Sequence, residues 1–146
     1  MANQGVAAVK VEVLAHQLEV SRGSFYWHFK NRPELLEEIL KRWETETLWL
    51  IEESQKETTP EARLIKMFAL AEELFDLPDP EAAIFIWANQ ESRVQERVRI
   101  VETRRVNYLN QLLQDYGFDE IEARQKAEIG YFAFMGFWER RERDKK

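Results

Sequence analysis

Arg22 and Ser24 lie in the segment SRGSFYWHF, residues 21–29, and both side chains can hydrogen-bond to base edges in DNA. Ser21 can accept a backbone N–H and so begin a short helix, which can enter the major groove with Arg22 facing phosphates or bases. Gly23 would let the backbone come close to the DNA. These four residues therefore make the segment a candidate for sequence-specific DNA binding.

Catalytic and metal-binding residue patterns are weak in this sequence. The chain has no cysteine, and its two histidines, His16 and His28, both fall near the N-terminus. No helix would present the Glu-x-x-His or His-x-x-x-His spacing that binds a metal. Acidic pairs such as Glu72 and Glu73 are typical of solvated helix faces. We therefore expect no enzymatic activity, no cofactor and no metal.

The composition is typical of a soluble helical protein. Hydrophobic residues make up 45% and charged residues 33% of the chain, and only five glycines and four prolines are present to interrupt helices. The absence of cysteine fits the reducing cytoplasm, and no apolar run approaches the ~18 residues that a membrane span needs. We therefore expect a cytoplasmic protein that does not associate with membranes.

The charge distribution distinguishes the N-terminal segment from the rest. A net charge of −6 argues against a nucleic-acid partner, but residues 1–32 hold four basic and two acidic side chains. The remainder of the chain is strongly acidic. A small basic head on an acidic body is therefore expected.

Two short helices joined by a tight turn are expected in the head. Residues 11–18 place apolar side chains on one helical face, and the second helix begins at Ser21. Phe25 and Phe29 recur four residues apart and so hold the second helix in place. We expect Trp27 to pack beneath the helix that follows, because aromatic residues are most often part of the core.

Longer helices are expected behind the head. Asn31 and Glu34 have the spacing of a capping box for a connector helix at 32–56, which is long enough to bridge two units. The segment 82–88 is apolar on every side, which predicts that it is buried. Further helices are expected at 60–76, 82–88, 91–116 and 119–141, with caps at Thr59, Asp79 and Asp119 and a left-handed Gly117 ending the third. An all-α fold follows.

The segment LAHQLEVSRGSFYWHFKNRPELLEEIL, residues 14–40, resembles the TetR/AcrR family of transcriptional regulators. It carries in order a leucine-alanine step, a helix-turn-helix turn, an aromatic recognition helix, a lysine and a leucine-rich helix. The resemblance implies that Tyr26, His28 and Lys30 grip the phosphate backbone beside the base readers. It also implies a regulator that binds a double-stranded operator as a repressor and is released by a small molecule.

The sequence departs from the family pattern at the turn, at one helix cap and at both ends. Glu19 stands where relatives usually have glycine, and a left-handed residue with a side chain costs about 1 kcal/mol. Lys10 stands near a position that is usually a serine or threonine cap. Relatives carry one more helix before the position of Gly5 and one more after the last. We therefore expect an N-terminally truncated DNA-binding domain at 1–42 and a helical ligand-binding and dimerisation domain at 43–146.

The body is expected to bind a ligand and to dimerise. Its aromatic side chains could surround an apolar pocket, although each of them could also simply fill the core. The last helix is apolar almost all round from Ala127 to Trp138, which predicts a symmetric homodimer. The alternative function is a helical dimer or ligand-binding module that has lost DNA binding through truncation of its head. The expected contacts of an apolar or aromatic ligand are Phe68, Trp87, Tyr108, Tyr131 and Phe134.

Overall fold

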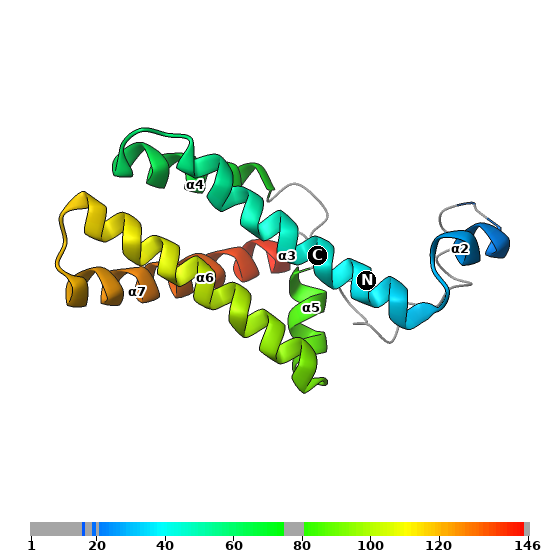
Figure 1. Cartoon of the computed structure of the whole chain (residues 1–146). Helices are drawn as coiled ribbons and strands as arrows, with labels where there is room; N and C mark the ends of the chain where they lie inside the picture. The colour runs from blue at the N-terminus through cyan, green and yellow to red at the C-terminus, as the bar shows by residue number, and fades with distance from the viewer. Residues whose placement is uncertain (1–15, 17–18, 20, 75–80, 145–146) are drawn as a thin grey trace. The chain divides into compact units, whose positions relative to one another are not determined.

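A computed structural model describes residues 16, 19, 21–74 and 81–144 (Figure 1). The fold is all-α, as predicted, and no strand occurs among these residues. None of the described helices is long and apolar enough to cross a membrane. The predicted helix at 11–18, apart from the helical His16, and the predicted cap at Asp79 lie outside the described residues. The helices are α2 (Arg22–His28), α3 (Arg32–Gln55), α4 (Pro60–Leu74), α5 (Glu81–Ala88), α6 (Ser92–Tyr116) and α7 (Glu120–Asp144).

The chain forms two compact units. In its described part, the first unit contains the residues up to Glu46 together with 81–96, and the second contains 47–74 and 97–144. The long helices α3 and α6 each contribute residues to both units. The predicted connector helix is therefore confirmed in its extent, while the functional boundary between residues 42 and 43 stays a prediction.

The core of the first unit is built on one stripe of α3. Leu36, Leu40 and Trp43 recur at helical spacing and are 5%, 0% and 3% exposed. Full burial of each such side chain stabilises the fold by about 1.5–3 kcal/mol. The helix α5 is largely buried, as its apolar sequence predicts, although Ile86 stays 41% exposed. Its buried apolar residues are Ala83, Ile84, Trp87 and Ala88.

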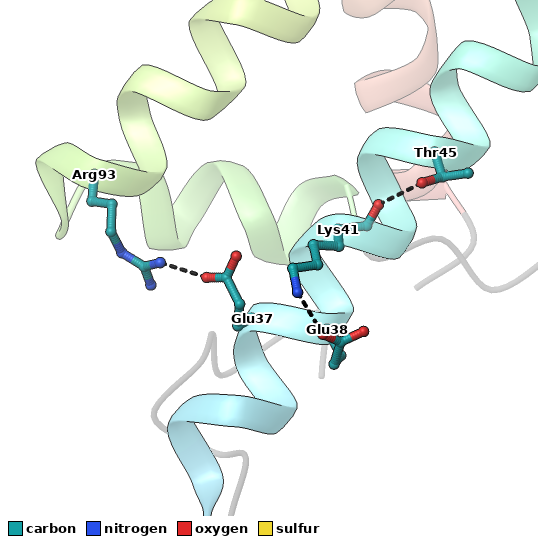
Figure 2. Close-up of polar contacts among 5 residues, drawn as sticks. All are labelled: Glu37, Glu38, Lys41, Thr45 and Arg93. Carbon is teal, nitrogen blue, oxygen red and sulfur yellow. Dashed lines mark hydrogen bonds and ion pairs between the residues drawn. The ribbon is translucent and has the colours of Figure 1, made fainter.

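An ion pair in the first unit joins α3 to the start of α6. The Arg93 guanidinium points at the Glu37 carboxylate, and its Nη1 donates a hydrogen bond to Glu37 Oε2 at 2.5 Å (Figure 2). Arg93 is the second residue of α6, so this contact fixes the first turn of that helix against α3.

In the second unit, α6 and α7 form an antiparallel pair (Figure 1). Val106 on α6 packs with Ala127 and Tyr131 on α7. At the edge of this contact, Arg124 Nη1 donates a hydrogen bond to Asn107 Oδ1 at 2.9 Å. The partly buried side chains of Leu109, Leu113 and Met135 complete the cluster.

Local sequence signals set the helix ends in the second unit. Thr59 Oγ1 accepts the Ala62 N–H at 3.1 Å, and Asp119 Oδ1 accepts the Glu122 N–H at 2.9 Å. Both bonds satisfy amides in a first helical turn, which confirms these two caps. Gly117 has a φ of 120° and ends α6, also as predicted. The helix α7 continues to Asp144, past the predicted end at residue 141.

Candidate nucleic-acid interface

The helix α2 begins at a well-formed cap. Ser21 has an extended backbone with φ −72° and ψ 155°, and its Oγ accepts the Ser24 N–H at 3.1 Å. At the other end, the Phe29 N–H donates to the Phe25 carbonyl at 2.9 Å. The predicted cap at Ser21 is confirmed, and it fixes the residue from which the side chains of α2 project.

One face of α2 packs against the protein through Phe25, which is only 8% exposed. Phe29 is half-buried, and its ring centroid lies 5.5 Å from that of Phe25. The predicted role of these two residues in holding the helix is therefore confirmed. The remaining faces of α2 are left for contacts with a partner.

Most of the predicted DNA contacts are exposed. Ser24 is half-buried, and the side chain of Arg22 lies outside the described part of the structure. A Cβ built on Gly23 would meet only Ser21 Oγ, at 3.6 Å, which is ordinary van der Waals contact. Packing within the protein therefore does not require glycine there. The exposed members of the set are Ser21, Gly23, Tyr26, His28 and Lys30.

The prediction that Trp27 packs beneath the connector helix is wrong. Its side chain is 82% exposed, and its ring makes an edge contact with His28 at 4.7 Å. Position 27 is two residues after Phe25 and so lies roughly 200° around the helix from the packed face. From that spacing, the sequence could have predicted that Trp27 is exposed. Its neighbour Tyr26 is also exposed, at 54%.

The corner between α2 and α3 is closed by two hydrogen bonds. Asn31 Oδ1 accepts the Glu34 N–H at 2.9 Å, which confirms Asn31 as the cap. Glu34 Oε2 accepts the Lys30 N–H at 2.5 Å. In the predicted capping box, the Glu34 carboxylate would accept the Asn31 N–H. In the structure it accepts the N–H of the preceding residue, Lys30, instead. Lys30 is thereby tied to α3 through its backbone.

Charged side chains along α3 are paired with one another. Lys41 and Glu38 form an ion pair at 2.7 Å (Figure 2), and Arg42 and Glu46 form another at 2.7 Å. The hydrogen bond that Arg42 Nε donates to the Glu46 carboxylate, together with the negative charge of Glu46, raises the pKa of the Arg42 guanidinium. No three His, Asp or Glu side chains in the described ranges are placed to hold a metal ion.

The predicted ligand contacts fall in both compact units. Phe68 on α4 and Phe134 on α7 are in edge contact, with ring centroids 6.2 Å apart. Tyr131 is only 4% exposed and belongs to the cluster between α6 and α7. Trp87 is a buried residue of the first unit, whereas the other four belong to the second. The structure thus brings together Phe68 and Phe134 directly.

Tyr108, the fifth predicted ligand contact, has a buried polar partner. Its hydroxyl lies 2.6 Å from Ser54 Oγ, and Ser54 is 0% exposed. The Ser54 hydroxyl donates its single hydrogen to the Ile51 carbonyl at 2.9 Å, so Tyr108 is the donor to Ser54. Ser54 was not among the predicted residues. The sequence could have indicated it, because Ser54 follows the apolar Leu50 and Ile51 by four and three residues and so lies on the same face of α3.

A short exposed helix, held by a buried aromatic residue in the head of an all-helical chain, is how helix-turn-helix proteins present a recognition helix to DNA. The family model for bacterial regulatory proteins of the TetR family matches residues 1–39. The match supports identifying the chain as a TetR-family regulator, that is, a DNA-binding regulator of transcription. No curated protein and no solved structure matches the chain.

Proposed function

We propose that this protein is a ligand-responsive repressor that binds its operator as a homodimer in the cytoplasm and leaves it when a small molecule binds. The observation that carries DNA binding is the asymmetry of α2. Phe25 is buried, while Tyr26 and Trp27 on the other faces are 54% and 82% exposed. A helix packed on one side and rich in exposed donors on the other suits insertion into the major groove.

Each predicted contact residue of α2 and its flanks has a proposed role. Arg22 and Ser24 read base edges, and Tyr26, His28 and Lys30 contact phosphates. We add Trp27 to the residues that contact the sugar-phosphate backbone. Its indole is exposed to water in the free protein, and burying it against DNA would be favourable. Ser21 and Gly23 complete the surface: the first caps the helix, and the second leaves space for a close approach.

The salt dependence of DNA binding tests this function. Wild-type protein should bind a fluorescein-labelled duplex with an affinity that falls steeply as salt rises, because phosphate contacts release counterions. Replacing Lys30 by Ala should reduce the slope of log K against log salt by about 1. Lys66→Ala, on α4 in the second unit, is the matched control and should leave the slope unchanged. Salt-independent binding, or an unchanged slope in K30A, would contradict the proposal.

The specific role of Arg22 is tested separately. Arg22→Ala should relax the preference at one base position in a selection from randomised duplexes, while the salt slope changes little if the guanidinium reads a base. Ser24→Ala should act at a neighbouring position. Identical selected sequences from wild-type protein and both variants would remove base reading from these residues.

Dimerisation is proposed through α7. Ile129, Phe132 and Phe137 are 70%, 65% and 54% exposed, and they share a helix with two glycines, Gly130 and Gly136. A Cβ built on either glycine would meet nothing within 4 Å in the protomer. Exposed apolar side chains interrupted by small residues suit close packing of a second helix. Light scattering should therefore show a dimer at micromolar concentration.

Ligand binding is proposed for the aromatic residues of the second unit. Phe68 remains 48% exposed although its ring contacts Phe134, so this pair has surface to offer an apolar or aromatic molecule. Tyr108 on α6, Tyr131 on α7 and Trp87 stay predicted ligand contacts from the sequence. The dye 1-anilinonaphthalene-8-sulfonate is a suitable probe. Its fluorescence enhancement should fall in F68A and F134A, and equal enhancement in wild type and both variants would contradict the site.

A further inference from the structure

We infer that Glu34, an acidic residue of the DNA-binding head, is a positioning residue for the phosphate contact of Lys30. The inference rests on the proposed function, since it assigns a residue that supports DNA binding without touching DNA. Acidic side chains near a phosphate-binding surface normally weaken the complex. The geometry points to the opposite effect for Glu34.

The bond that carries the inference links two helices. Lys30 lies in the short connection between α2, which ends at His28, and α3, which begins at Arg32. Its backbone N–H donates to Glu34 Oε2 at 2.5 Å. The Glu34 N–H in turn donates to Asn31 Oδ1 at 2.9 Å. The two bonds close a small loop that fixes the backbone from which the Lys30 side chain extends.

Glu34 is itself held by a well-packed helix. Leu36 and Leu40, on the same helix, are 5% and 0% exposed, and Glu37 is tied to Arg93 one turn after Glu34. The carboxylate is therefore attached to a fixed support. A hydrogen bond to an ionised acceptor is stronger than one between neutral groups, and it restrains the donor accordingly. Lys30 consequently starts from a defined position rather than from a free loop.

Reach and charge can be separated at this position. Glu34→Gln keeps a carbonyl oxygen at the same distance from the backbone but removes the negative charge. Glu34→Asp keeps the charge but is one methylene shorter, so the oxygen no longer reaches the Lys30 N–H. If Glu34 acts only through its charge, the Asp variant matches wild type and the Gln variant binds DNA more tightly. If it positions Lys30, the Asp variant is the impaired one.

Glu38 provides matched controls on the same helix. It is exposed, and its carboxylate is paired with Lys41 rather than with the α2–α3 corner. The variants E38Q and E38D repeat the same two chemical changes one turn away. They measure how much DNA affinity changes when charge, helix propensity and the pair with Lys41 are altered on α3 without a change at the α2–α3 corner. These changes are subtracted from those of E34Q and E34D.

Binding is measured by fluorescence anisotropy with a labelled duplex of mixed sequence at low and at physiological salt. After correction by the change in E38D, E34D should bind about two- to fivefold more weakly than wild-type protein, as expected for the loss of one hydrogen bond. The salt slope should be the same in both, because Lys30 keeps its charge. Equal affinities of E34D and wild-type protein after this correction would overturn the inference.

Amide hydrogen exchange supplies a readout that needs no DNA. The Lys30 N–H should exchange faster in E34D than in E34Q and wild type, and circular dichroism should show that all variants fold. Equal exchange in E34D and E34Q would overturn the inference while leaving the proposed function intact. Wild-type protein that does not bind the duplex in a salt-dependent way would overturn the proposed function and the inference with it.

Discussion

Arg93 and Glu37 are separated by 56 positions in the chain, yet their side chains form a direct ion pair (Figure 2). Their side chains are 57% and 31% exposed, so the pair is only partly shielded from solvent. An ion pair of this kind is weak and sensitive to salt. It nevertheless connects α3 to the first turn of α6.

Replacing Arg93 by Gln should lower the free energy of unfolding by about 0.5–1 kcal/mol at low salt, because Glu37 loses its partner on α6. The loss should shrink at high salt, where screening already weakens the pair. Urea unfolding at two salt concentrations measures both effects. Arg104→Gln is the control, since Arg104 lies on the same helix and its side chain makes no hydrogen bond or ion pair within the described residues. A loss in R93Q that is independent of salt would show that the ion pair is not its cause.

Replacing Glu19 by Gly should stabilise the protein by about 0.5–1 kcal/mol. Glu19 has a φ of 53°, a left-handed conformation that glycine adopts without strain. Glu19→Ala should give no such gain, because alanine has a Cβ and meets the same strain. Thermal unfolding of the two variants and wild type decides the question, and equal stability of E19G and E19A would rule out backbone strain at the turn.

Replacing Ser54 by Ala should cost about 1 kcal/mol, because it leaves the partly buried Tyr108 hydroxyl without its acceptor. Tyr108→Phe removes the other partner and should cost a similar amount. The double variant should lose less than the two single losses combined, since the two residues share one bond. A double-mutant cycle in urea measures this coupling. Strict additivity would mean that the bond at 2.6 Å does not contribute to stability.

Replacing Gly136 by Ala should have opposite effects on the protomer and the dimer. In the protomer a Cβ at this position meets nothing within 4 Å, and alanine favours a helix over glycine by about 1 kcal/mol. At a dimer interface formed by α7 the same methyl group would hold the second helix away. The variant should therefore be more stable than wild type at high dilution and should dissociate at a higher concentration in analytical ultracentrifugation. Tighter association of G136A would place the interface elsewhere.

Local sequence patterns were enough to predict where most of the described helices begin and where α6 ends. The caps at Ser21, Thr59 and Asp119 and the left-handed Gly117 all appear as expected. Each depends on atoms within about one helical turn, so the residues beside it contain the information. The resemblance in residues 14–40 likewise predicted the match of the TetR-family model to residues 1–39, because a helix-turn-helix motif occupies one continuous segment.

Tertiary structure decided which of these residues meet. Trp27 was expected in the core, but the packing of Phe25 turns it to solvent, at 82% exposure. The sequence did not indicate that Glu37 would pair with Arg93. The burial of a side chain and its partner depends on which distant segment packs beside it, and helical spacing alone does not specify that neighbour. For the same reason, the sequence predicted the apolar α5 to be buried, but only the packed chain places it in the first unit with the head.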